Sequence, residues 1–260
     1  MKFIQKKRGG NMGYFSQQHL DALTGDDHKA LQEATERMTN LHQKVFKAIS
    51  LSDMDLNLLV APKDAVNDNT LADPEDLDTL TVAYTRSRSQ AVMIEKLMGR
   101  EDVASVNNLR PHLHPAIELR LWKEGFVIEV IAERDAWYDQ QNLMGKLSIA
   151  RHKQELYTSL MGMDEKYRMG FWKGVYPSEM HLASKYFQHP RIMDEWISTF
   201  HPLADWLRLG IWYEIDDETL TEEGIVEEVM KQIRILYRFY IFFLWTNENN
   251  FRDFYTNTPS

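Results

Sequence analysis

The chain has 260 residues, of which 30 are basic and 39 acidic, so its formal net charge is −9. Hydrophobic residues make up 43% of the chain and there is no cysteine. This composition excludes disordered proteins, disulfide scaffolds and proteins with Cys-ligated zinc or iron–sulfur clusters. The acidic balance argues against a general nucleic-acid coat, which needs a dominant basic surface. The strongest apolar run, 235–245, is too short for the ~20 residues that span a bilayer, so we expect a cytoplasmic globular protein.

The charge is concentrated in three segments of the sequence. Residues 1–11 contain four basic and no acidic side chains, whereas 64–78 and 214–228 contain acidic side chains only. The rest of the chain is nearly neutral, so its net charge does not exclude an anionic ligand. We interpret residues 1–12 as a flexible basic tail and the acidic segments as solvated loops or helix starts. The alternative is that the acidic segments dock a basic protein partner.

The first hundred residues predict a helical layer followed by strands. Ser16 and either Asp26 or Asp27 are suited to cap two helices, the second of which has an apolar face as far as Ile49. Loose alternation before a proline predicts a short strand over 53–61. The next elements are a loop over 63–78, a strand over 80–86 and a short helix over 89–98.

The clearest local signal is an antiparallel hairpin in the middle of the chain. Apolar and polar residues alternate over 117–122 and again over 126–133, and the turn between these runs contains Gly125. Further strands are predicted over 169–175 and 207–214. Helices are predicted over 135–161, 178–187, 190–200 and 225–245.

Strands and helices do not alternate regularly along the chain, which favours an α+β fold. We predict a mostly antiparallel sheet of about five strands covered by helices, with an N-terminal helical layer and a long C-terminal core helix. The sequence has no internal repeat and no linker that would divide it. Residues 13–260 are therefore predicted to form a single domain.

Asp53 and Asp55 form the first candidate site. Two residues apart on a predicted strand, they point the same way, and paired carboxylates can bind a divalent metal. The string SDMDLNLLV over 52–60 resembles the metal-binding strand of small nucleotidyltransferases, although the preceding Gly-Ser turn of that family is missing. The resemblance implies a metal-dependent enzyme acting on nucleotides or phosphodiesters, with a third carboxylate at Glu118 or Glu129. The alternative is a strand start with exposed aspartates.

His112 and His114 form the second candidate site, in a segment with proline on both sides. Two histidines two residues apart in an extended segment can reach the same metal ion. No Asp or Glu lies at a spacing that would complete a known zinc site. In the enzyme hypothesis His114 would assist the metal site, and in the alternative this segment is a rigid loop before the hairpin.

One face of the predicted sheet combines aromatic, basic and acidic side chains. If the strands 169–175 and 207–214 join the hairpin, the side away from the apolar residues holds Glu118, Arg120, Trp122, Glu129, Trp172, Arg208 and Trp212. Flat aromatic walls and bidentate arginines suit a ligand cleft or a protein interface. The alternative is a second core in which Arg and Glu pair across strands, and the strand register decides between the two.

The sequence contains no GxGxxG, P-loop, GxSxG, HExxH or EF-hand motif. We therefore predict a non-enzymatic binding or interaction protein, an accessory subunit or ligand-binding domain that uses the Trp/Arg/Glu face. Its expected partner is a protein or a small anionic ligand, and a second copy of the chain or nucleic acid stay open. The only cofactor considered is the divalent metal of the enzyme hypothesis.

Overall fold

The computed structural model describes residues 13–101, 103, 108–175, 182–183, 186 and 189–251. The basic tail predicted for residues 1–12 lies outside the described residues, and so does most of the helix predicted over 178–187.

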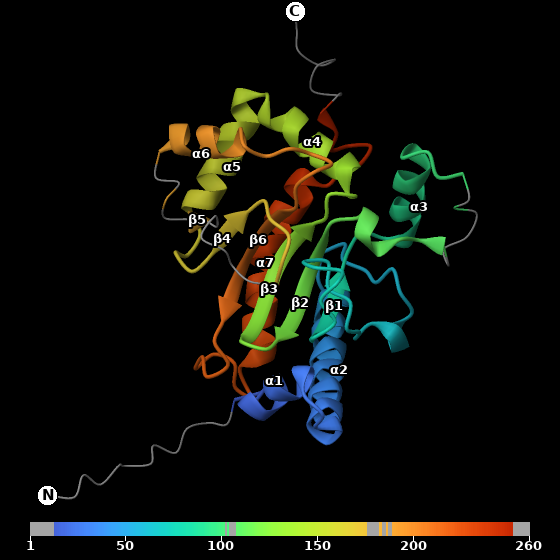
Figure 1. The fold of residues 1–260 in the computed structure, drawn as a ribbon. Coiled ribbons are helices and arrows are strands. Elements are labelled where there is room, and N and C mark those ends of the chain that lie inside the picture. The colour runs from blue at the N-terminus through green and yellow to red at the C-terminus, as the bar shows by residue number, and fades with distance from the viewer. Residues whose placement is uncertain are drawn as a thin grey trace, which may run out of the picture.

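A six-stranded antiparallel sheet organises the fold, with the strand order β1-β2-β3-β6-β4-β5 (Figure 1). The strands are β1 Thr79–Tyr84, β2 Ala116–Trp122, β3 Gly125–Ala132, β4 Arg168–Gly170, β5 Leu182–Ala183 and β6 Leu207–Tyr213. The α+β class and the antiparallel sheet are confirmed, with one strand more than expected. The strand predicted over 53–61 is wrong, because this segment is a turn after a helix with a single bridge from Asn57 to Thr85.

Seven α-helices are present in the described residues: α1 Gln17–Thr24, α2 His28–Ser50, α3 Arg88–Leu97, α4 Trp137–Leu147, α5 Ala150–Met161, α6 Pro190–Ile197 and α7 Ile225–Phe243. As predicted, Ser16 precedes α1 and Asp27 caps α2, where its carboxylate accepts the Ala30 amide. No described helix is both long and apolar enough to cross a membrane. Two short 3₁₀ helices, Pro62–Asp64 and Pro111–Leu113, precede β1 and β2.

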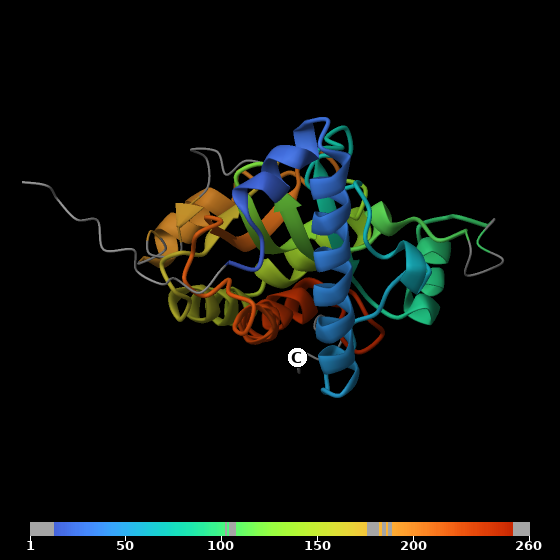
Figure 2. The ribbon, with the colours of Figure 1, turned by 90° about the horizontal axis from the view of Figure 1, so that it is seen from below.

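The main hydrophobic core lies between one face of the sheet and helices α1, α2 and α7 (Figure 2). Alternation along the hairpin turns Ile117, Leu119, Ile128 and Val130 toward these helices, and each is at most 1% exposed. Burying one such side chain stabilises the fold by roughly 1.5–3 kcal/mol. The helices therefore cover the apolar face, and the polar face of the same strands lies on the other side.

Candidate ligand pocket beside a buried ion-pair network

The strand register brings together the charged residues of the predicted Trp/Arg/Glu face. Glu118 on β2 lies directly opposite Glu129 on β3, and Glu129 lies opposite Gly210 on β6. Arg120 comes two residues after Glu118 on β2 and Arg208 two residues before Gly210 on β6, so both point to the same side. All four charged side chains are fully buried. We call Glu118, Arg120, Glu129 and Arg208 the Glu/Arg tetrad.

The two glutamates and the two arginines of the tetrad form ion pairs with one another. Like charges directly opposite on neighbouring strands repel, but Nη1 of Arg120 lies 2.7 Å from Oε1 of Glu118 and 2.6 Å from Oε1 of Glu129. Arg208 donates two parallel hydrogen bonds of 2.8 Å to the Glu129 carboxylate. Burial alone would raise the pKa of Glu129, but the adjacent Arg208 and Arg120 outweigh it and hold this pKa below its usual value.

Aromatic rings pack around the tetrad. The guanidinium carbon of Arg208 lies 5.2 Å from the centre of the Trp172 ring and 5.8 Å from that of Trp212, within the range of cation–π attraction. Gly170 permits this arrangement, because a β-carbon there would overlap the Trp172 indole. Trp122 is 5% exposed and belongs to a small second apolar cluster on this face. The aromatic and glycine residues of the face thus contact the protein's own side chains.

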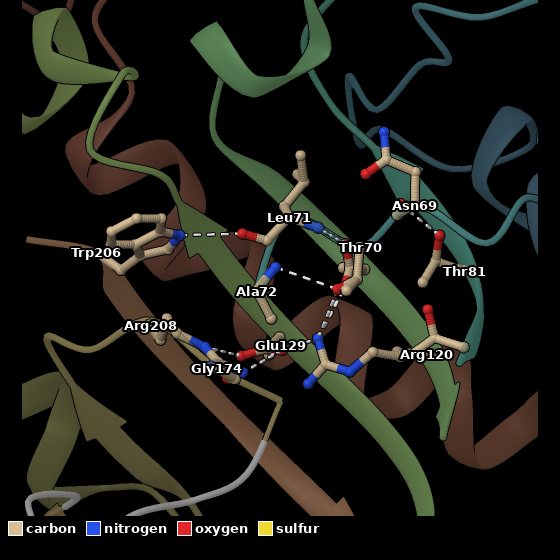
Figure 3. Close-up of polar contacts among 12 residues, drawn as sticks. Asn69, Thr70, Leu71, Ala72, Thr81, Arg120, Glu129, Gly174, Trp206 and Arg208 are labelled. Atoms are coloured by element: carbon tan, nitrogen blue, oxygen red, sulfur yellow. Dashed lines mark hydrogen bonds and ion pairs between the residues drawn. The ribbon is translucent and has the colours of Figure 1, made fainter. Parts of the chain in front are cut away.

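A loop from the acidic segment covers the tetrad, and we call its residues 69–75 the first strap (Figure 3). The Thr70 hydroxyl donates to Oε1 of Glu118 at 2.6 Å, and the Leu71 amide donates to Oε2 at 2.8 Å. Nη1 of Arg120 donates to Oγ1 of Thr70 at 3.1 Å. The strap is therefore fixed to the sheet by hydrogen bonds to buried charges, which are stronger than those between neutral groups.

A second strap, residues 171–175, follows β4 and joins the first. The Gly174 amide donates to the Ala72 carbonyl oxygen at 2.8 Å, and Nζ of Lys173 lies 3.1 Å from Oδ1 of Asp73. Arg208 donates to the Gly174 carbonyl oxygen (Figure 3). In the part of the chain that the structure describes, these two loops cover the tetrad, so a ligand would contact it only if the straps moved. Ligand contact by the predicted face residues stays a prediction.

A cavity of about 490 Å³ lies where the covered face ends. Ala132 of β3 pairs with Leu207 of β6, and the residues just outside this pair, Glu133 and Trp206, both line the cavity. Trp206 is held in place because its indole N–H donates to the Leu71 carbonyl oxygen at 3.0 Å. The wall also contains Asn69, Pro74, Glu75, His112, Arg134, Asp135 and Lys173. We call this cavity the rim pocket.

The charged side chains of the rim pocket are paired, with one exception. Nε of Arg134 lies 3.7 Å from Oδ1 of Asp135, and Nζ of Lys173 lies 3.0 Å from Oε2 of Glu75. Glu133 is only 5% exposed and makes no hydrogen bond or ion pair through its carboxyl group with any residue that the structure describes. Arg134 and Lys173 act on Glu133 only at longer range, so an ionised Glu133 would leave the wall one positive charge short.

Glu133 is held in its neutral form by this environment. Burial raises its pKa to about 8, and the negative charges of Asp135 and Glu118 act in the same direction. At pH 7 the group is protonated in most molecules. A buried carboxyl group without a partner destabilises the fold, and such strongly shifted groups in cavities are typical of functional sites.

The structure does not bring the proposed metal ligands together. Asp53 and Asp55 are exposed in the turn after α2, where Oδ1 of Asp55 accepts a hydrogen bond of 2.8 Å from Asn57. Glu118 is buried in the tetrad and bonded to the first strap. Among the described residues, no group of three or more His, Asp or Glu side chains could hold a metal ion.

His112 and His114 have different surroundings. His114 is fully buried with Nε2 at 3.0 Å from Oε1 of Glu95, and burial lowers the pKa of this imidazole. Glu95 also accepts the Arg110 amide at 2.8 Å, so this contact fastens the segment before β2 onto α3. His112 is half-buried and lines the rim pocket instead.

Sequence reasoning missed Glu133 as a site residue, although alternation along 126–133 placed it on the same side as Glu129. The available signal was an acidic residue at the end of a polar strand face, next to a loop. Comparison of the chain with models of known protein families gave no match, and no curated protein matches it. Function must therefore be inferred from the geometry of the site.

Proposed function

We propose that this chain is a binding protein that takes up a small protonated amine in the rim pocket. The Glu133 carboxylate would be the counter-ion of the amine, and Trp206 would form a flat wall beside it. The observation that supports this most directly is a buried carboxyl group that lines a cavity of about 490 Å³ and has no described partner.

Charge decides the class of ligand. The arginines that first suggested an anionic ligand, Arg120 and Arg208, are neutralised by Glu118 and Glu129. In the rim pocket the unpaired group is acidic, so a cation completes the pairing and an anion does not. The binding or interaction protein predicted from the sequence is kept, but with a cationic ligand at the rim of the polar face.

The Trp206 ring supports the same choice. The Arg134 guanidinium carbon lies 5.8 Å from its centre, so a cation already occupies the distance at which indole attracts positive charge. Such contacts contribute about 0.5–1 kcal/mol at exposed sites such as that of Arg134. An amine bound between this ring and Glu133 would have one aromatic and one ionic contact.

Isothermal titration calorimetry at pH 7 tests the proposal with three probes of the same shape: benzylamine, benzyl alcohol and benzoate. We expect benzylamine to bind at least tenfold more tightly than the neutral or anionic probe. Because burial raises the pKa of Glu133 to about 8, binding of the amine at pH 7 should release a proton from this group. Titrations in two buffers with different ionisation enthalpies measure the number of protons released.

Two variants locate the effect. Glu133→Gln keeps the shape of the side chain and should abolish both the preference for benzylamine and the proton release. Glu124→Gln, the matched control, changes an exposed glutamate in the turn between β2 and β3 and should leave both unchanged. Equal affinity for benzylamine in wild type and Glu133→Gln, or tighter binding of benzoate, would overturn the proposal.

A further inference from the structure

A second cavity, of about 700 Å³, lies away from the polar face, between α5, α7 and the turn that follows α7. Figure 2 shows α5 and α7 side by side. The cavity wall combines aromatic residues of α7, such as Tyr237 and Phe242, with basic residues from α4, α5 and α7. It contains none of the residues of the rim pocket.

Lys146, in the last turn of α4, is the buried cation of this cavity, with 2% of its surface exposed. Its ammonium group donates to the Phe242 carbonyl oxygen and to Oδ1 of Asn249, and lies 4.9 Å from the centre of the Phe242 ring. An ammonium group has three donors, so one remains for a ligand. Burial lowers the pKa of Lys146 to about 8, which leaves the group charged at pH 7.

Two arginines from different helices line the same cavity. Arg151 belongs to α5 and Arg238 to α7, and both side chains are exposed. Neither forms a hydrogen bond or an ion pair with any residue in the described part of the chain. By contrast, Arg37 pairs with Glu222 at 2.6 Å and Arg191 with Glu195 at 2.8 Å.

The two carboxylates of the cavity wall form no direct ion pair with these cations, although the charge of Glu155 acts favourably on Lys146 at longer range. Oε2 of Glu155 lies 3.4 Å from Nδ1 of His152, and Oδ1 of Asp55 accepts a hydrogen bond from Asn57. Three basic groups thus stand against two carboxylates, in a chain whose overall charge is −9. This local excess of positive charge, with two unpaired arginines, is the reverse of the deficit in the rim pocket.

We propose that this cavity is a second binding site, specific for a small aromatic phosphomonoester. The phosphate would contact Arg151, Arg238 and the free donor of Lys146. A guanidinium group can donate two parallel hydrogen bonds to two oxygens of one phosphate. The aromatic body of the ligand would pack against Tyr237 and Phe242. This inference is independent of the amine site, since the two cavities share no residue.

Isothermal titration calorimetry with phenyl phosphate at pH 7 and low salt tests the inference, with phenol and benzoate as the uncharged and carboxylate probes. We expect phenyl phosphate to bind at least tenfold more tightly than either. Arg151→Gln and Arg238→Gln should each weaken its binding at least tenfold. The matched control is Arg234→Gln, an exposed arginine on the same helix outside the cavity wall, which should leave the affinity unchanged.

Equal affinity for phenyl phosphate in the Arg238→Gln and Arg234→Gln variants would overturn the inference, and tighter binding of benzoate would overturn the phosphate class. Replacing Lys146 removes two buried hydrogen bonds and can unfold the chain, so the exposed arginines provide the decisive variants. Glu133→Gln should leave phenyl phosphate binding intact. A failure of the amine site and a failure of this site are therefore distinguished with the same set of proteins.

Discussion

Glu129 and Glu133 are the same residue type, four positions apart, with side chains on the same side of the sheet, and both are buried. Glu129 lies between Arg120 and Arg208, and its pKa is held below the usual value. Glu133 has no described partner, and burial raises its pKa to about 8. Burial and partners together set the pKa, because Glu118, which contacts one arginine where Glu129 contacts two, keeps a pKa raised by burial.

The two glutamates also contribute to the protein in different ways. Glu129 is part of a neutral network in which each charge has a counter-charge within hydrogen-bonding distance. The network holds the two straps over the sheet, because Glu118 forms a hydrogen bond with the first strap and Arg208 with the second. Glu133 accepts hydrogen bonds from Gln140 and Ala136 only through its backbone carbonyl oxygen, which leaves its carboxyl group available to a ligand.

The largest expected effect on stability comes from removing an arginine partner of Glu129. Arg208→Met removes both hydrogen bonds to Glu129 and leaves a buried carboxylate with less compensation. Removal of one partner from a buried ion pair costs about 3–5 kcal/mol. Urea denaturation measures the change in the free energy of unfolding. The double variant Glu129→Gln/Arg208→Met should recover part of the loss, and a double variant no more stable than Arg208→Met would contradict the pairing.

Removing the unpaired carboxyl group should change the pH dependence of stability. The pKa of Glu133 is about 8 in the folded chain, against 4.5 as its ordinary value. Between these values the folded state holds a proton that the unfolded state has lost, so stability falls as the pH rises and levels off above about pH 8. The loss reaches roughly 3 kcal/mol at pH 7. Glu133→Gln removes this contribution.

Urea denaturation of both proteins at several pH values between about 5 and 8 checks this. We expect the stability of Glu133→Gln relative to wild type to rise with pH over this range. The difference between the two proteins is the relevant quantity, because histidines shared by both also titrate there. Parallel stability curves would mean that Glu133 is ionised in the folded protein.

The sequence predicted local structure and side-chain direction well where a strong period was present. Alternation over 117–122 and 126–133 identified the hairpin and placed Glu118, Arg120 and Glu129 on one face, as the register shows. The segment 53–61 failed because its loose alternation reflects residues packed in a turn and not a strand. Short-range patterns are reliable when one face of a strand is buried.

Alternation of apolar and polar residues could not predict which segments cover the polar face of the sheet. The acidic segment 64–78 was correctly predicted to be a loop, but nothing in its composition indicates that Thr70 bonds to Glu118, 48 positions away. The partners of Glu129 and the isolation of Glu133 likewise depend on long-range packing. Alternation gives the direction of a side chain, whereas its partner and its pKa depend on segments distant in sequence.

The smallest expected effect concerns the contact between the two straps. Lys173 is partly exposed and pairs with Asp73 and Glu75, and exposed ion pairs contribute little to global stability. Lys173→Gln should therefore leave the urea midpoint unchanged but speed hydrogen exchange of the Gly174 amide, which bonds to Ala72 across the straps.

The matched control for this prediction is Lys153→Gln. This variant removes the ion pair between Lys153 of α5 and Asp194 of α6, in which the lysine is about as exposed as Lys173. That variant should leave exchange at Gly174 as it is in wild type. Lys173 lines the rim pocket, where its charge repels an amine. If Lys173→Gln speeds exchange at Gly174 and also the association of both benzylamine and the neutral benzyl alcohol, opening of the straps controls access to the rim pocket. Faster exchange with unchanged association would mean that the amine enters past Glu133 while the straps stay closed over the Glu/Arg tetrad.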